Sequence, residues 1–300
     1  MVEEHPLSFS HASVLPLAHG DVAPEPSIAS VMGAWPFEPL VWLGLGLAAW
    51  WYLRGYARVP AYPSVRRLHW LLGLAVVALA LASPVAVYEG SLFSVHMLQH
   101  LLLTMVGAPL LVLGAPVTLA LRAASPRGRR RLLRVLHSGP VRFMTHPVVT
   151  WSIFALVMWL THFSPLYDLA LENEVVHVAE HFLYLTAACP FWWPVIGLDP
   201  GANRLGWPGR IAYLFLAMPQ QSFLGLAIHQ SNEPLYEHYA TLARTWGPTP
   251  LADQQQAGTI MWVGGDFLFI AALVLAVLAW MRHEQRATQH LDRRLDEAAL

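Results

Sequence analysis

Residues 92–121 read LFSVHMLQHLLLTMVGAPLLVLGAPVTLAL and contain no Asp, Glu, Lys or Arg. A helix needs roughly 20 mostly apolar residues to cross a lipid bilayer, and this stretch is longer than that. Pro109, Gly114 and Pro116 interrupt it, so we expect a kink at which neighbouring helices or water satisfy the freed backbone groups. The stretch therefore predicts a bent transmembrane helix.

The composition of the whole chain agrees with a membrane location. Of the 300 residues, 56% are hydrophobic and 12% are charged. This is about half the charged fraction of soluble proteins and too little to cover a water-facing surface. The single cysteine, Cys189, excludes a disulfide or a cysteine-based metal site within one chain. We therefore expect a lipid bilayer around most of the chain and no nucleic-acid partner.

Six further segments have the apolar character of membrane helices, and none indicates a strand. We predict an all-α fold, a polytopic bundle of about seven transmembrane helices at residues 37–282. An extracytoplasmic tail at 1–36 would precede the bundle, and a cytoplasmic tail at 283–300 would follow it. The tail at 1–36 lacks the basic and apolar regions of a cleavable signal, so the first helix should direct insertion. The predicted spans are 37–53, 68–81, 92–121, 148–160, 175–196, 210–228 and 258–281.

Arginine is unevenly distributed between the predicted loops. Basic loop residues mark the cytoplasmic side of a membrane protein. They cluster after the first, third and seventh spans, which predicts an outer N-terminus and a cytoplasmic C-terminus. We interpret the arginine run at 127–134 as a topology anchor in contact with anionic lipid rather than a partner-docking site. The cytoplasmic arginines are Arg54, Arg58, Arg66, Arg67, Arg122, Arg127, Arg129, Arg130, Arg131, Arg134, Arg142, Arg282, Arg286, Arg293 and Arg294.

Ten of the 15 histidines fall on the predicted outer side. Two pairs, His96 with His100 and His177 with His181, have i,i+4 spacing, which places both imidazoles of a pair on one helical face. Four predicted helices bring histidine to the same depth, where polar side chains are unfavourable unless they face a cavity and have a partner. We therefore predict a metal or cofactor site here. The other outer histidines are His5, His11, His19, His162, His229 and His238.

Several residues near this level could complete or tune such a site. Imidazole binds Cu, Zn, Fe and Ni, whereas a thioether would favour Cu(I). Met97 and Met158 lie close to outer histidines, although core packing is the alternative role for both. Glu180 and Asp168 are acids that could bind or tune the metal. Asp266 lies deep in the last predicted span, where an ionisable group is either functional or hydrogen-bonded to a neighbouring helix.

Six blocks of sequence lie around and after these histidines. Their residues and their order along the chain resemble the CtaG family of caa3-type cytochrome c oxidase assembly factors, a group of multi-helix membrane proteins. The resemblance covers the third to the seventh predicted span. The blocks are FSVHMLQHLLLTM at 93–105, APLLVLG at 108–114, SPLYDLAL at 164–171, His-x-x-Glu-His at 177–181, FWWP at 191–194 and GTIMWVGG at 258–265.

The resemblance implies a multi-pass protein of the bacterial plasma membrane that is needed to mature a haem-copper oxidase and has a role in copper handling. Its partners would be oxidase subunits and an extracytoplasmic copper donor. It does not extend to His5, His11, His19 or His238. It carries the site onto the matched positions His96, His100, His177 and His181, with Asp168 and Glu180 as nearby acids.

The sequence leads to one main hypothesis and three rival ones. In the main hypothesis an outward pocket binds Cu(I) through the two histidine pairs, with His162 or His229 as a further ligand. The chain then passes the ion to an apo-oxidase subunit by ligand exchange, and no enzymatic activity is expected. His-x-x-Glu-His also matches an inverted zinc-protease motif, with a third ligand from His96 or His100. The remaining two hypotheses are a redox protein that holds haem between His100 and His181, and a metal-free scaffold.

Overall fold

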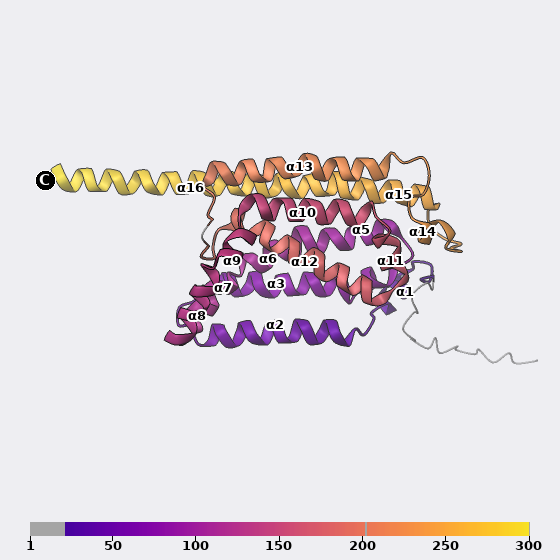
Figure 1. Ribbon diagram of the computed structural model, residues 1–300, viewed down its shortest axis with the longest axis horizontal. Helices are drawn as coiled ribbons and strands as arrows, with labels where there is room; N and C mark the ends of the chain where they lie inside the picture. The colour runs from indigo at the N-terminus through magenta and orange to yellow at the C-terminus, as the bar shows by residue number, and fades with distance from the viewer. Residues whose placement is uncertain (1–21, 202, 300) are drawn as a thin grey trace, which may run out of the picture.

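The computed structural model describes residues 22–201 and 203–299, and throughout this part the regular elements are all helical. Most helices run side by side in one bundle, and the last one projects far beyond it (Figure 1). The all-α prediction is confirmed, while His5, His11 and His19 lie outside the described residues. The elements are α1 (Ile28–Gly33), α2 (Pro39–Ala57), α3 (Ser64–Leu81), α4 (Pro84–Tyr88), α5 (Phe93–Leu101), η1 (Leu102–Gly107), α6 (Ala108–Leu113), α7 (Pro116–Ala123), α8 (Pro126–Leu136), α9 (Gly139–Met144), α10 (Pro147–His162), α11 (Leu166–Glu172), α12 (Glu174–Ile196), α13 (Trp207–His229), α14 (Glu237–Thr241), α15 (Pro250–Thr259), η2 (Ile260–Gly264) and α16 (Gly265–Ala299).

Each predicted span coincides with a helix or a broken helix, but the structure does not support seven membrane spans. Length and hydropathy identify four spans in the described chain, or five if α10 and α11, bent by 68°, form one broken span. Helices α2 and α12 do not meet this test. Helix α12 carries two glutamates and two histidines in its first turns, which lowers its hydropathy. The four spans are Ser64–Tyr88, Phe93–Ala123, Trp207–His229 and Pro250–Arg294.

The third predicted span is broken near its proline and glycine residues. The π-helix η1 joins α5 to α6, and Ala115, with a left-handed φ of 50°, separates α6 from α7. In a π-helix such as η1, each N–H bonds to the carbonyl five residues earlier. The carbonyl of Thr104 would therefore pair with the N–H of residue 109. Because Pro109 has no N–H, this carbonyl lacks its helical donor. The indole of Trp192 on α12 donates to this carbonyl instead, at 2.8 Å.

Replacing Trp192 with phenylalanine is expected to lower the free energy of unfolding by about 1–3 kcal/mol, because a buried carbonyl then loses its donor. Thermal unfolding of the purified protein in detergent measures the effect. Trp193→Phe is the matched control, since this neighbouring indole is only partly buried. Equal melting temperatures for the two variants would contradict the role given to Trp192.

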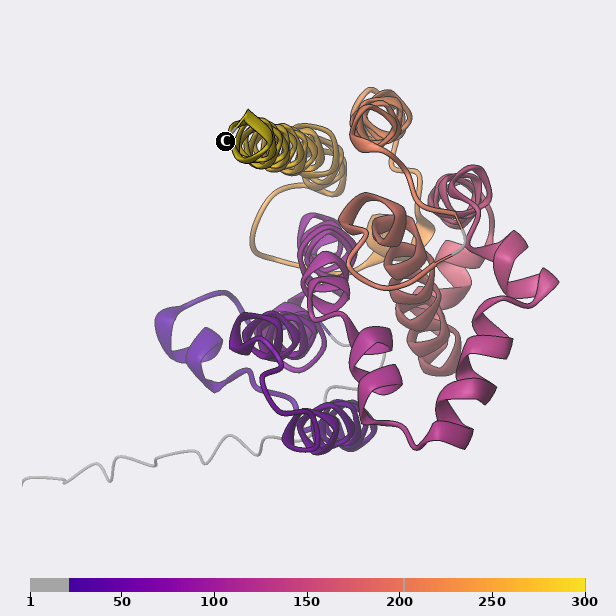
Figure 2. The ribbon, with the colours of Figure 1, turned by 90° about the vertical axis from the view of Figure 1, so that its left-hand side faces the viewer.

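Helix α13 packs along α15 and α16 at one edge of the bundle (Figures 1 and 2). Gly225 on α13 and Gly258 on α15 meet where these helices cross. A Cβ atom added to Gly258 would lie 2.6 Å from the backbone nitrogen of His229. One added to Gly225 would lie 2.7 Å from the backbone nitrogen of Trp262. The two backbones therefore touch, and the contact fixes α15 against α13.

Candidate metal site

Five histidines and two glutamates gather inside the bundle near the start of α5 and α12. None of these side chains is more than 9% exposed. Ionisable groups at this degree of burial need hydrogen-bond partners or a bound cation. We call this set the histidine cluster. Its members are Glu89 after α4, His96 and His100 on α5, His162 at the end of α10, and His177, Glu180 and His181 on α12.

The start of α5 is fixed by a residue far along the chain. Leu92 precedes the helix and cannot accept a hydrogen bond through its side chain, so the first N–H groups lack a local cap. Asp253 of α15 accepts hydrogen bonds from the backbone of Phe93 at 2.7 Å and of Ser94 at 3.3 Å. It also accepts one from the Ser94 hydroxyl at 2.5 Å. This carboxylate therefore positions the helix that carries two histidines of the cluster.

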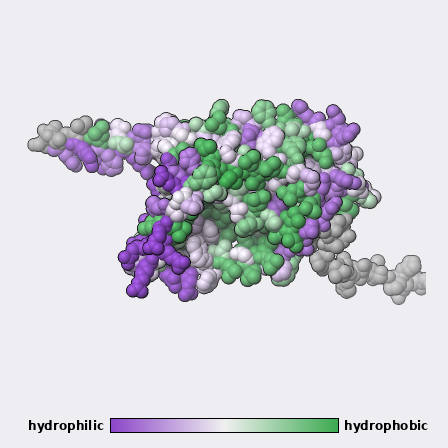
Figure 3. Space-filling model, viewed as in Figure 1, coloured by the Kyte–Doolittle hydropathy of each residue, from purple (hydrophilic) through white to green (hydrophobic). Residues whose placement is uncertain are grey.

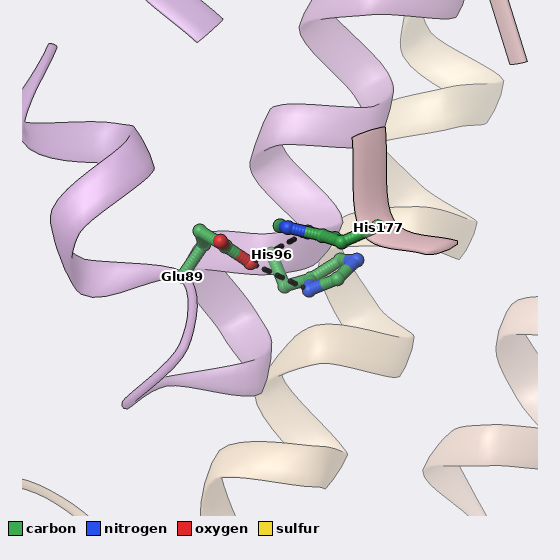
Figure 4. Close-up of side chains that lie close together, drawn as sticks. All are labelled: Glu89, His96 and His177. Atoms are coloured by element: carbon green, nitrogen blue, oxygen red, sulfur yellow. Dashed lines mark ion pairs between the residues drawn. The ribbon is translucent and has the colours of Figure 1, made fainter. Parts of the chain in front are cut away.

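Glu89 lies between histidines of two different helices (Figure 4). Its Oε2 atom is 2.9 Å from Nδ1 of His96 and 3.4 Å from Nε2 of His177. One ligand atom from each of the three lies within 4.8 Å of the others, a spacing that fits a shared cation. Burial would raise the pKa of Glu89, but His177 and His96 outweigh it and hold this pKa well below its usual range. The carboxylate is therefore negatively charged.

A second group of three shares His96 and includes His100, one helical turn further along α5. Their Nε2 atoms are 2.8 Å apart, so a proton or a cation must lie between the two lone pairs. Glu180 is 3% exposed, and neither of its oxygens makes a hydrogen bond to a described residue. These three residues again offer ligand atoms within 4.8 Å of one another. In the same part of the chain, Nδ1 of His100 and Nε2 of His162 are also buried without a hydrogen-bond partner.

The tautomers of two histidines follow from their neighbours. The carbonyl of Ala80 can only accept, so the side-chain amide of Gln99 donates to it at 3.0 Å and turns Oε1 towards Nε2 of His181, at 2.8 Å. His181 must therefore donate through Nε2, and only its Nδ1 could bind a metal. His162 donates through Nδ1 to the carbonyl of Met158 at 2.6 Å, which leaves Nε2 for a metal.

Tyrosines from the segment after α13 close over the cluster. The hydroxyl of Tyr239 donates to the backbone carbonyl of Glu89 at 2.9 Å and lies 3.2 Å from Nδ1 of His96. The hydroxyl of Tyr236 donates to the backbone carbonyl of His162 at 3.0 Å. Burial raises the pKa of Tyr239, so this hydroxyl keeps its proton. The two tyrosines tie their segment to the residues that surround the cluster.

Three residues predicted at the site lie apart from the cluster. His229 is held at the α13–α15 contact, where its Nδ1 is 2.9 Å from the carbonyl of Gln255. Asp266 accepts a hydrogen bond from the hydroxyl of Ser222 on α13 at 2.7 Å. Asp168 faces backbone N–H groups at the start of α14. Each of the three therefore contacts protein groups outside the cluster.

The ligand atoms that converge in the cluster are nitrogen and oxygen. Met97 and Met158 belong to the main hydrophobic core of the bundle, which is the packing role that the sequence left open for them. Cys189 packs against the same core. Buried carboxylate oxygens and imidazole nitrogens without partners fit a metal ion, because they supply lone pairs that no protein donor uses.

Sequence reasoning missed three residues that organise the cluster. Glu89 could have been singled out, since it is an acid seven residues before His96 at the same predicted side of the membrane. No local pattern identifies Gln99 or Asp253, because their partners lie 82 and 160 residues away in the chain.

The sequence has relatives in a described family. A family model for the cytochrome c oxidase caa3 assembly factor matches residues 49–283. Uncharacterized proteins of Mycobacterium bovis and Mycobacterium tuberculosis are each 33% identical to the chain over 283 residues, and one of Mycobacterium leprae is 32% identical over 288 residues. These alignments cover 90% of this chain and 43% of each relative, so the chain spans less than half the length of the curated relatives it matches. No solved structure matches. The chain belongs to the family of cytochrome c oxidase caa3 assembly factors.

Proposed function

We propose that the chain binds copper in the histidine cluster and passes it to a haem-copper oxidase subunit that lacks the metal. Family membership supports the assembly role. One observation carries the copper part: two groups of buried nitrogen and oxygen ligand atoms overlap at His96, and in one of them neither oxygen of Glu180 accepts a hydrogen bond from a described residue.

The proposal places the cluster on the outer side of a bacterial plasma membrane. Helices α2 and α12 would cross the bilayer together with the spans identified by hydropathy, which gives seven crossings, an outer N-terminus and a cytoplasmic C-terminus. The arginine-rich helix α8 supports this orientation, because it lies at the end of the bundle opposite the start of α5 (Figure 1). An extracytoplasmic copper donor would then reach the cluster side of the protein.

Copper, as Cu(I), is the ion we assign to this site. Neutral imidazoles bind copper well, and a copper ion could take the place of the proton shared by the Nε2 atoms of His96 and His100. Transfer to a partner requires an open coordination position. An ion bound only by His96 and His100 would keep such a position open. Glu89 and His177, which belong to the other group, could then bind the ion while it moves. This choice of ligands supports a carrier rather than a storage site.

The zinc-protease hypothesis has less support from the geometry. Among the described residues, no candidate metal group contains both His177 and His181, the two presumed zinc ligands of the motif. Nε2 of His181 is also engaged by Gln99. Zinc in the purified protein, together with peptide cleavage that Glu180→Gln abolishes, would favour the protease instead.

Elemental analysis of gently purified protein tests the proposal. We expect about one copper ion per chain in the wild type and under about a tenth of that in His96→Ala, because His96 belongs to both ligand groups. The matched control is His137→Ala/His290→Ala, two exposed histidines outside the cluster. Unchanged copper in His96→Ala, or a wild type without metal, would refute the proposal. A Soret band in the visible spectrum of the same sample would indicate haem instead.

A further inference from the structure

Where side chains are described, the basic residues of this chain form no ion pair with a carboxylate. All 18 of them are arginines. Among the residues whose side chains are described, the ion pairs join Glu89 to histidines, so no arginine there is paired with a carboxylate. Unpaired guanidinium groups that lie close together repel one another, and an anion from outside the chain can neutralise this repulsion.

Three of these arginines line one open cavity of about 430 Å³. The cavity lies between α7, α8 and the segment that follows α12. Its polar wall consists of Arg122, Arg129 and Arg204, all exposed, with the hydroxyl of Thr118. Its apolar wall includes Leu121 and Leu198, and no acidic residue lines it. The cavity therefore combines concentrated positive charge with an apolar side.

Hydrogen bonds within the protein leave most of the guanidinium donors available. Nε of Arg129 donates to the carbonyl of Leu121 at 3.0 Å. One terminal nitrogen of Arg204 donates to the backbone carbonyl of Asp199 at 3.4 Å. The carboxylate of Asp199 is the nearby negative charge, but it accepts from the backbone N–H groups of Val117 at 3.2 Å and Thr118 at 2.6 Å. It thus caps α7 rather than pairing with an arginine.

The surroundings of the cavity suit a molecule with both a charged and an apolar part. Helix α8 has five arginines and no acid in its 11 residues. Nearby apolar side chains are exposed, with Val135 at 50% and Phe143 of α9 at 64%. Hydrophilic residues gather at this end of the molecule, directly beside a hydrophobic surface (Figure 3). This is the boundary at which the headgroups of a bilayer lie.

We propose that this cavity binds the phosphate of an anionic phospholipid. The planar guanidinium groups of Arg122, Arg129 and Arg204 match the geometry of phosphate oxygens, with which arginine forms paired hydrogen bonds. The apolar wall and the exposed side chains of α8 and α9 receive the start of the acyl chains. The site lies at the end of the bundle opposite the histidine cluster and does not depend on copper binding (Figure 1).

Native mass spectrometry of the full chain in detergent tests the site with three probes: phosphatidylglycerol, phosphatidylcholine and inorganic phosphate. We expect phosphatidylglycerol to bind in preference to both others. The variant Arg122→Gln/Arg129→Gln/Arg204→Gln should lose at least about tenfold in its affinity for phosphatidylglycerol, which corresponds to the loss of about one charge-assisted hydrogen bond. Circular dichroism and copper content should match the wild type.

The control Arg127→Gln/Arg130→Gln/Arg131→Gln removes the same charge from residues that do not line the cavity. It should bind phosphatidylglycerol nearly as well as the wild type does. An equal loss in both variants would show a general effect of charge and overturn the site. Inorganic phosphate that binds as tightly as the lipid would overturn the assignment to a phospholipid.

Discussion

Replacing Asp253 with alanine is expected to lower the free energy of unfolding by about 2–4 kcal/mol and to remove most of the bound copper. Asp253 is 1% exposed and accepts three hydrogen bonds at the first residues of α5. Alanine would leave the N–H groups of Phe93 and Ser94 buried without an acceptor. Helix α5 would then start in a less defined position, and both of its histidines would move relative to α12.

The control for this prediction is Asp199→Ala. Asp199 caps α7 in the same way, through the N–H groups of Val117 and Thr118, but at the far end of the broken helix. We expect it to lower stability, with copper content unchanged. Thermal unfolding and elemental analysis on the same samples separate the two effects. If both variants keep their copper, Asp253 does not position the metal site.

Substitution of Gly258 by leucine is expected to prevent α13 and α15 from packing. Any Cβ at this position would lie 2.6 Å from a backbone nitrogen, so no side-chain rotamer relieves the clash and the helices must separate. The loss should exceed about 3 kcal/mol, because Asp253 on the same helix moves as well. We expect little monodisperse protein on size-exclusion chromatography.

Gly46→Leu is the matched control, because a Cβ added at Gly46 meets nothing within 4 Å. It should purify and unfold like the wild type. A Gly258→Leu variant that purifies in the same yield and melts at the same temperature as Gly46→Leu would show that the close crossing is not required.

Features that depend on local spacing could be predicted from the sequence. Apolar length located the helices, because a membrane imposes a minimum run of apolar residues. The i,i+4 pairs at His96 and His177 pointed correctly into one cluster, since residues one turn apart share a helical face. The break in the third span followed from Pro109 and Pro116, which have no N–H to continue the hydrogen-bond ladder.

Features that depend on rotation of one helix against another could not be predicted. His162 and His229 were placed at the same depth, yet one faces the cluster and the other faces α15. The depth of a residue in the membrane follows from its position along the helix. The direction in which its side chain points is set by packing of that helix against distant segments of the chain. Gln99 and Asp253 could not be identified for the same reason, because their partners lie in distant segments of the chain. The hydropathy test supports four or five of the seven predicted spans, and α12 fails it because the polar residues in its first turns lower its hydropathy.

Because the histidine cluster is closed off from solvent, the affinity for an ion and the rate at which the ion exchanges are set by different features. Ligand atoms set the equilibrium affinity, but Tyr236 and Tyr239 are bonded across the cluster, and none of its side chains is more than 9% exposed. If copper occupies the cluster as proposed, a small chelator in solution would therefore remove it slowly even if the chelator bound copper more strongly. Under the proposed function, delivery to a partner would require displacement of α14, so docking of the partner rather than affinity would set the time at which copper is released.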